Sequence, residues 1–112
     1  MSKDVEQKLN QLQLIEQNLQ QLLSQKQQFQ MQQMEIESAL SELEKTPQAY
    51  KIIGSIMVAS STQDLTKELK EKNDVVNVRI KTIEKQEEKL REKAGSYRKE
   101  VLEQMKGEQS VK

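Results

Sequence analysis

The sequence predicts a protein dominated by α-helix, in which a long antiparallel two-helix coiled coil carries one central β-hairpin. Three observations lead to this fold class. The 112 residues are rich in Glu, Lys, Gln and Leu, with 3% aromatic residues, one Pro and three Gly, a composition typical of long helices rather than of a compact core. Apolar residues recur at heptad spacing in two long segments. The short stretch between them has a β pattern. We therefore expect one domain over residues 1–112.

The central stretch, residues 48–60, is predicted to be a β-hairpin. Runs rich in β-branched and aromatic residues flank Gly54 and Ser55, a pair that suits a two-residue turn whose first position needs a positive φ. The ribbon has one face formed by Tyr50, Ile52, Met57 and Ala59, and another formed by Ile53, Ile56 and Val58. Both faces are largely apolar, and an isolated two-stranded ribbon is marginal in water. We expect other chains to cover the hairpin; the alternative is that it folds onto its own helices.

The first helix is predicted over residues 2–45. Ser2 is its candidate N-cap, and Pro47 ends it because proline has no N–H and disfavours helix at the preceding residue. Nine of twelve seam positions are apolar, which favours a coiled coil over the disorder that so polar a chain also suggests. The seam positions are Val5, Lys8, Leu12, Ile15, Leu19, Leu22, Lys26, Phe29, Gln33, Ile36, Leu40 and Leu43.

The second helix is predicted over residues 62–106, with residues 107–112 as a frayed tail. Ser61 and Asp64 have the spacing of a capping box just before an apolar run. Eight of its twelve seam positions are apolar. These positions are Thr66, Leu69, Asn73, Val76, Ile80, Ile83, Glu87, Leu90, Ala94, Tyr97, Val101 and Gln104. An antiparallel pair that turns back at the hairpin places residues whose numbers sum to about 109 at the same level.

Some residues do not fit a simple apolar seam. Lys26 and Glu87 are polar seam residues, and they either form an ion pair that fixes the register or extend to water. Four apolar residues lie outside the seam near the hairpin end. This group, which we call the collar, has two interpretations: a seam that drifts around the helices, or a surface that packs against a neighbouring subunit. The collar consists of Met31, Met34, Val75 and Val78.

The residue types present argue against an enzyme. The chain has no His and no Cys, so it lacks an imidazole base, a thiol nucleophile and the usual transition-metal ligands, and we expect no catalytic residues, no metal and no cofactor. The net charge is zero, which removes the electrostatic argument for nucleic-acid or membrane partners. No apolar run suits a signal peptide or the roughly 20 residues of a membrane span. We therefore expect a soluble cytoplasmic protein.

Three stretches resemble a known family when taken together. The hairpin AYKIIGSIMVAS, the helix start STQDLTKELKEK and the later RIKTIEKQEEKLREK are similar to the β-type subunits of the prefoldin family, especially the archaeal form. The motifs match between about Glu44 and Lys93, and the architecture matches over nearly the whole chain. A single hairpin is typical of the β type, since the α type carries two.

The resemblance implies a hexamer of two α-type and four β-type subunits, in which hairpins join into β-barrels and coiled coils project from them. It implies an ATP-independent chaperone, a holdase, that captures unfolded proteins at the coiled-coil tips and passes them to a group II chaperonin. The assembly residues are then Tyr50, Ile52, Ile53, Gly54, Ile56, Met57 and Val58. The client-binding tip residues are Val5, Leu9, Val101, Leu102 and Met105, although this tip follows no fixed family motif.

A different class of function also fits these residues. A structural coiled-coil adaptor would use the hairpin to join a fixed complex and one helix face to bind one folded partner. The two hypotheses differ in what they bind: a holdase protects many denatured proteins weakly, whereas an adaptor binds one folded protein tightly and in fixed proportion.

Overall fold

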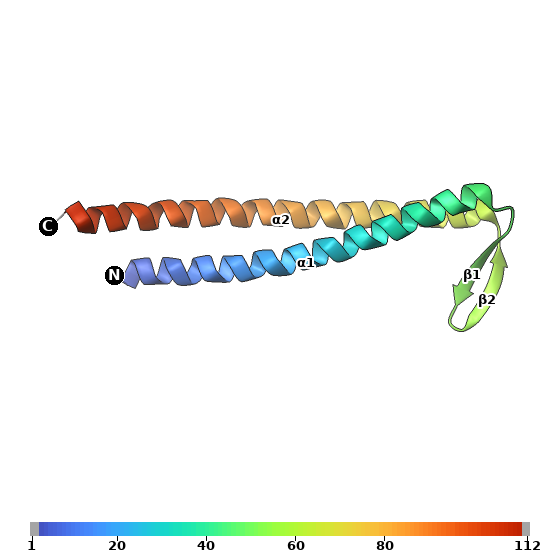
Figure 1. Ribbon diagram of the computed structural model, residues 1–112, viewed down its shortest axis with the longest axis horizontal. Coiled ribbons are helices and arrows are strands. Elements are labelled where there is room, and N and C mark those ends of the chain that lie inside the picture. Colours follow the sequence, from blue (N-terminus) through green and yellow to red (C-terminus); the bar gives the residue numbers. More distant parts are fainter. Residues whose placement is uncertain (1–2, 111–112) are drawn as a thin grey trace. The chain divides into compact units, whose positions relative to one another are not determined.

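The computed structural model describes residues 3–110 and consists of two helices and two strands (Figure 1). In chain order these are α1 (Lys3–Lys45), β1 (Ala49–Ile53), β2 (Ile56–Ser60) and α2 (Thr62–Ser110). The described residues form two units: a terminal unit of residues 3–25 and 82–110, and a hairpin unit of residues 26–81. In each unit a segment of α1 runs antiparallel to a segment of α2. The predicted fold class is confirmed.

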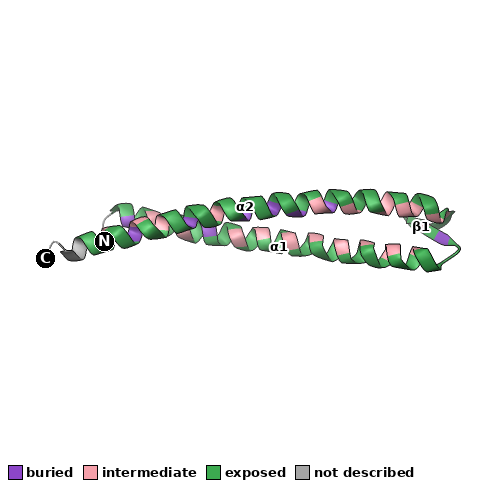
Figure 2. Ribbon diagram, turned by 90° about the horizontal axis from the view of Figure 1, so that it is seen from above, coloured by how far each residue is buried: buried purple, intermediate pink, exposed green. Residues whose placement is uncertain are grey.

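The heptad pattern locates the seam correctly in both helices. All twelve predicted seam positions of α1 and all twelve of α2 are buried or half-buried (Figure 2). The predicted levels also agree with contacts inside each unit. Lys8 pairs with Glu100 in the terminal unit, and the Gln33 amide donates a hydrogen bond to the Asn77 side chain in the hairpin unit. The residue numbers in each pair add up to within one of 109, as the antiparallel arrangement about the hairpin requires.

Local side-chain bonds set the helix ends that face the hairpin. The Thr46 hydroxyl donates to the Glu42 carbonyl over 2.8 Å, which satisfies one of the last carbonyls of α1 before Pro47 stops the helix. At the start of α2, the Ser61 hydroxyl oxygen accepts a 3.0 Å hydrogen bond from the Asp64 N–H. The Ser61 carbonyl accepts the first helical bond, from the Leu65 N–H, over 3.1 Å. Ser61 is therefore the N-cap of α2, as predicted.

The far ends of the helices differ from the prediction in one respect. The helix α2 continues through Ser110, whereas the sequence suggested a frayed tail from residue 107. Gly107 costs a helix only about 1 kcal/mol relative to alanine, and the chain has no proline there to end the helix. The predicted start at Ser2 and the last two tail positions, 111 and 112, lie outside the described residues.

The hairpin forms with the predicted register. Ile53 pairs with Ile56, and Lys51 pairs with Val58. Gly54 has a φ of 61°, a conformation that glycine adopts without the steric cost a Cβ would impose. Among the described residues no other residue has a positive φ, which is the pattern of a type II′ turn with glycine at its first central position.

The two units bury their apolar side chains unequally. The terminal unit contains buried residues from both helices, whereas in the hairpin unit the α1 residues are half-buried at most. The buried apolar residues of the terminal unit are Val5, Ile15, Ile83, Ala94 and Val101, and those of the hairpin unit are Ala49, Val76 and Ile80. The helix pair is thus more open next to the hairpin than in the terminal unit.

Candidate functional site

The hairpin exposes apolar side chains on both faces. Ile52 is 69% exposed and its cross-strand partner Met57 is 65% exposed, on one face. Ile53 and Ile56 are exposed on the other. All six large apolar residues that the sequence assigned to assembly are exposed: Tyr50, Ile52, Ile53, Ile56, Met57 and Val58. The alternative of a hairpin covered by its own helices is therefore wrong for these side chains. A contiguous apolar surface of this kind is typical of an interaction site.

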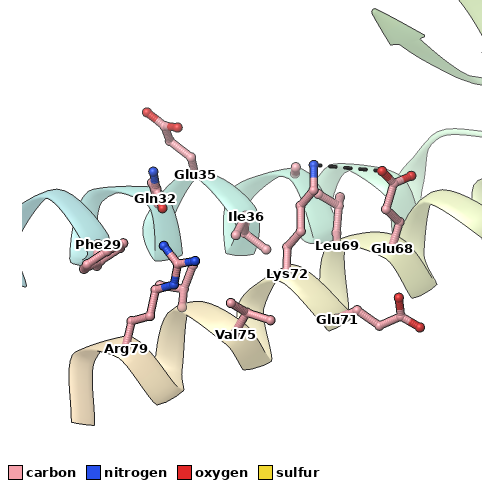
Figure 3. A pocket seen from close by; sticks show the side chains of 12 residues that line it. Phe29, Gln32, Glu35, Ile36, Glu68, Leu69, Glu71, Lys72, Val75 and Arg79 are labelled. Atoms are coloured by element: carbon pink, nitrogen blue, oxygen red, sulfur yellow. Dashed lines mark ion pairs between the residues drawn. The ribbon is translucent and has the colours of Figure 1, made fainter. Parts of the chain in front are cut away.

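The base of the hairpin is held against α2. Ala49 is only 8% exposed, and the Lys51 ammonium lies 2.9 Å and 3.0 Å from the two carboxylate oxygens of Glu68. Lys72, one turn further along α2, lies 3.9 Å from the same carboxylate (Figure 3). The hydrogen bond from Lys51 is the largest effect and lowers the pKa of Glu68; desolvation opposes it, and the positive charges of Lys51 and Lys72 lower the pKa further. Glu68 therefore stays ionised at neutral pH.

Sequence reasoning missed this contact. Lys51 and Glu68 are 17 residues apart and belong to different elements, so no helical or strand period connects them. One signal was available: Lys51 is a charged residue on the hairpin face that otherwise carries Ile53, Ile56 and Val58. A single charge on an apolar face predicts a nearby partner of opposite charge.

An open groove runs along the helix pair of the hairpin unit, next to the hairpin base. It has a volume of 730 Å³, and Figure 3 shows side chains from both helices around it. The Arg79 guanidinium lies over the Phe29 ring at 5.6 Å from the ring centroid, which closes one end of the groove. Its apolar lining comprises Phe29, Ile36, Ala39, Leu69, Val75 and Val76. This groove accounts for the shallow burial of α1 in the hairpin unit.

The five predicted tip residues divide into two groups in the terminal unit. Val5 is fully buried, with 0% exposure, and Val101 is also buried, so both act as seam residues that join the helix ends. Leu9, Leu102 and Met105 are exposed, Leu102 to 59%. The heptad pattern had placed Val5 and Val101 at the limit of the seam, and the structure shows that the seam extends that far. The exposed residues among the five are therefore Leu9, Leu102 and Met105, which we call the tip surface; Leu14 of the same unit is exposed as well.

The collar residues of the hairpin unit are exposed. Met31, Met34, Val75 and Val78 all remain accessible to solvent, although the side chain of Val75 also lines the groove. The interpretation of a seam that drifts to include them is therefore wrong, because the seam keeps its predicted positions. A role for the collar in packing against another subunit stays a prediction.

The polar seam residue Glu87 lies deep in the terminal unit. It is 2% exposed, among the most buried side chains there, and one of its carboxylate oxygens lies 3.8 Å from the Arg91 guanidinium. Lys26 is half-buried in the hairpin unit. A buried charged group in a coiled-coil seam reduces stability but favours one register over others.

The described residues contain no group of three or more Asp, Glu, His or Cys side chains placed to hold a metal ion. Within the same residues, neither helix is both long enough and apolar enough to cross a membrane.

Comparison with known proteins identifies the family. The family model described as "Prefoldin subunit" matches residues 6–108. This chain belongs to the prefoldin family. The prefoldin subunit beta of Archaeoglobus fulgidus is 44% identical over 87 residues, which cover 74% of each chain. That of Methanothrix thermoacetophila is 40% identical over 89 residues, covering 77% of this chain and 74% of the relative.

A solved prefoldin structure has the same fold. The crystal structure of the prefoldin beta subunit from Thermococcus strain KS-1 superimposes with a TM-score of 0.86 at 34% identity, over 90% of this chain and 91% of that one. The resemblance to archaeal β-type prefoldin subunits noted in the sequence is thereby confirmed. The two helices and the two-stranded hairpin of this chain therefore form a prefoldin β-type fold.

Proposed function

We propose that this prefoldin subunit is part of an ATP-independent chaperone that holds unfolded proteins at its coiled-coil tips and passes them to a group II chaperonin. In this proposal four copies combine with two α-type subunits in a cytoplasmic hexamer, with no enzymatic activity and no cofactor. The observation that carries the proposal is the hairpin with apolar side chains exposed on both faces. Such a ribbon is only marginally stable in water by itself, and other subunits that extend and cover it would stabilise it.

The tip surface supports the proposal that unfolded proteins bind at the coiled-coil tips. Leu9, Leu102 and Met105 are exposed apolar side chains, and an unbranched, flexible side chain such as that of Met105 adapts to partners of different shape. A few such residues give weak binding at each tip. Several tips joined in one complex raise the effective concentration of binding sites, which provides useful avidity while each single contact stays weak enough for release.

The structure sharpens the experiment that tests this function. Deleting the helix ends would also remove the buried seam residues Val5 and Val101 and would loosen the helix pair. Point substitutions at exposed positions avoid this difficulty. We therefore choose Leu9→Ser, Leu102→Ser and Met105→Gln together, and Leu23→Ser as a matched control, because Leu23 is a leucine of α1 with nearly the same exposure as Leu9 that lies outside the tip surface, the collar and the hairpin.

Each variant is combined with an α-type prefoldin subunit, and aggregation of a chemically denatured protein is followed by light scattering without ATP. We expect the unmodified complex and the Leu23→Ser complex to suppress aggregation, and the triple variant to assemble but protect poorly. Equal protection by the triple variant would refute the assignment of the tip surface. Failure of every complex to protect, combined with tight binding of one folded protein in fixed proportion, would instead support the structural adaptor.

A further inference from the structure

We propose that Lys51 and Glu68 form a latch that fixes the direction in which the hairpin leaves its helices. The latch would thereby determine how the apolar faces of the hairpin are presented to sister subunits. The first statement concerns the single chain and stands independently. The second rests on the proposed function, because it requires that hairpins from several chains assemble.

The hairpin has few other contacts that would hold its direction. Ala49 is buried at its base, but the apolar side chains from Tyr50 outward on β1 and from Ile56 to Val58 on β2 are exposed. The chain enters β1 directly after Pro47 and Gln48 and leaves β2 at Ser61, the N-cap of α2. Short links fix where a ribbon is attached, but they allow it to swing about the point of attachment.

Lys51 is well placed to prevent that motion. It is the central residue of the five-residue strand β1, opposite Val58, so a contact there acts at a distance from the point of attachment. Its ammonium bonds both carboxylate oxygens of Glu68, at 2.9 Å and 3.0 Å. A lysine ammonium is a point charge on a flexible stem, so this contact holds the middle of β1 near Glu68 by attraction rather than by a fixed bond geometry.

Neighbouring charges strengthen the latch on the helix side. Lys72 lies 3.9 Å from the same carboxylate, and this pair, four residues apart on α2, favours a Glu68 side chain that stays on the hairpin side of the helix. Lys51, Glu68 and Lys72 line a pocket between the hairpin and the helices, and Glu42 and Tyr50 also line this pocket. Glu71 points away from Lys72 and Glu68 (Figure 3) and serves as the natural control position.

The latch is weak in absolute terms because both side chains are partly exposed. Pairs of this kind shift an equilibrium by about two- to fivefold, and salt screens them. An interaction of this size would allow the hairpin to adjust during assembly. A prefoldin hexamer contains several hairpins, so the effect of losing the latch would multiply across the subunits.

The direction of the hairpin is measured with two spin labels. The chain has no cysteine, so Ser55→Cys at the turn and Lys70→Cys on α2 provide two unique attachment points within the hairpin unit. Labelled chain is diluted into unlabelled chain so that each assembly carries one labelled copy. The distance distribution between the labels is compared for the parent, Glu68→Gln, Glu71→Gln and the parent in 1 M salt, where the Debye length falls to about 3 Å.

We expect Glu68→Gln and high salt to broaden the distribution, and Glu71→Gln to leave it unchanged. Inverting all three charges with Lys51→Glu, Glu68→Lys and Lys72→Glu is expected to restore the narrow distribution, since every attraction is kept with its sign reversed. An unchanged distribution in Glu68→Gln would overturn the latch, because the backbone links alone would then determine the direction.

The effect of the latch on assembly with other subunits is measured separately. The midpoint concentration of assembly with the α-type subunit is expected to rise by about two- to fivefold for each altered subunit in Glu68→Gln, and to stay at the parent value in Glu71→Gln. A broadened distance distribution with an unchanged midpoint would refute the link between the latch and assembly. If the parent chain does not assemble at all, the proposed function fails, while the distance measurement still decides whether the latch exists.

Discussion

Replacing Ile52 with alanine is expected to weaken assembly more than it weakens the fold of a single chain. The substitution removes about 2.4 kcal/mol of apolar transfer free energy, at about 0.8 kcal/mol for each carbon group lost. Because Ile52 is 69% exposed in the single chain, about 1.7 kcal/mol of that total is gained only when another subunit covers it. The dissociation constant of that interface should therefore rise about 15- to 20-fold. The free energy of unfolding of the unassembled chain should fall by only about 0.7 kcal/mol.

The assay compares two substitutions of the same type. Sedimentation at a series of dilutions gives the midpoint of assembly, and urea unfolding followed by circular dichroism below that midpoint gives the stability of the chain. Ile83→Ala is the matched variant, because Ile83 is buried in the helix pair of the terminal unit and its truncation should lower the free energy of unfolding by about 2–5 kcal/mol. Ile52 does not lie in an interface between subunits if Ile52→Ala leaves the midpoint within twofold of the parent and destabilises the unassembled chain by about 2 kcal/mol.

Three further predictions concern the hairpin and its attachment. Gly54→Ala should destabilise the hairpin by about 1–3 kcal/mol, because the turn requires a φ of 61°, although a Cβ would meet no atom within 4 Å. Amide exchange in both strands should become faster, and unchanged exchange would contradict this prediction. Ser61→Ala should lower the free energy of unfolding by about 0.5–2 kcal/mol through loss of the N-cap of α2, whereas Ser61→Asp should keep stability near the parent value. Lys51 lowers the pKa of Glu68. The ion pair between them therefore stabilises the chain fully above the ordinary glutamate pKa of about 4.3. This stabilisation is lost as the pH falls through the lowered pKa of Glu68 in the folded chain. Amide exchange in the hairpin of the parent, corrected for its intrinsic pH dependence, should therefore increase as the pH falls through the lowered pKa of Glu68. The Glu68→Gln variant should lack this increase.

Much of the fold follows from periodicity and local chemistry in the sequence. The heptad spacing located every seam position of both helices, since a helix brings residues three and four apart onto one side whatever it packs against. Gly54 marked the turn, and with it the strand register, because only glycine adopts a positive φ at low cost. Ser61 was recognised as an N-cap from its spacing to Asp64. Each of these features depends on a few neighbouring residues.

The depth of burial along the seam could not be derived in the same way. Val5 and Val101 occupy seam positions near the helix ends, where a helix pair is expected to fray, yet both are buried. Leu9 and Leu102 are as apolar as these residues but remain exposed. The heptad pattern places Leu9 and Leu102 outside the seam, but it does not say how deeply a seam position near a helix end is buried. That depth depends on the residues of the facing helix at the same level, which a pattern read along one helix does not contain.

The sequence by itself determined the class of fold, the seam, the turn and the apolar character of both hairpin faces, because these depend on short-range spacing and on the conformational preferences of single residues. Only the tertiary structure decided that the hairpin stays exposed, that Lys51 reaches Glu68, and that the groove opens beside the hairpin base. These features arise where elements distant in the chain meet. Their geometry depends on how the hairpin is attached to the helices and on which side chains oppose each other there.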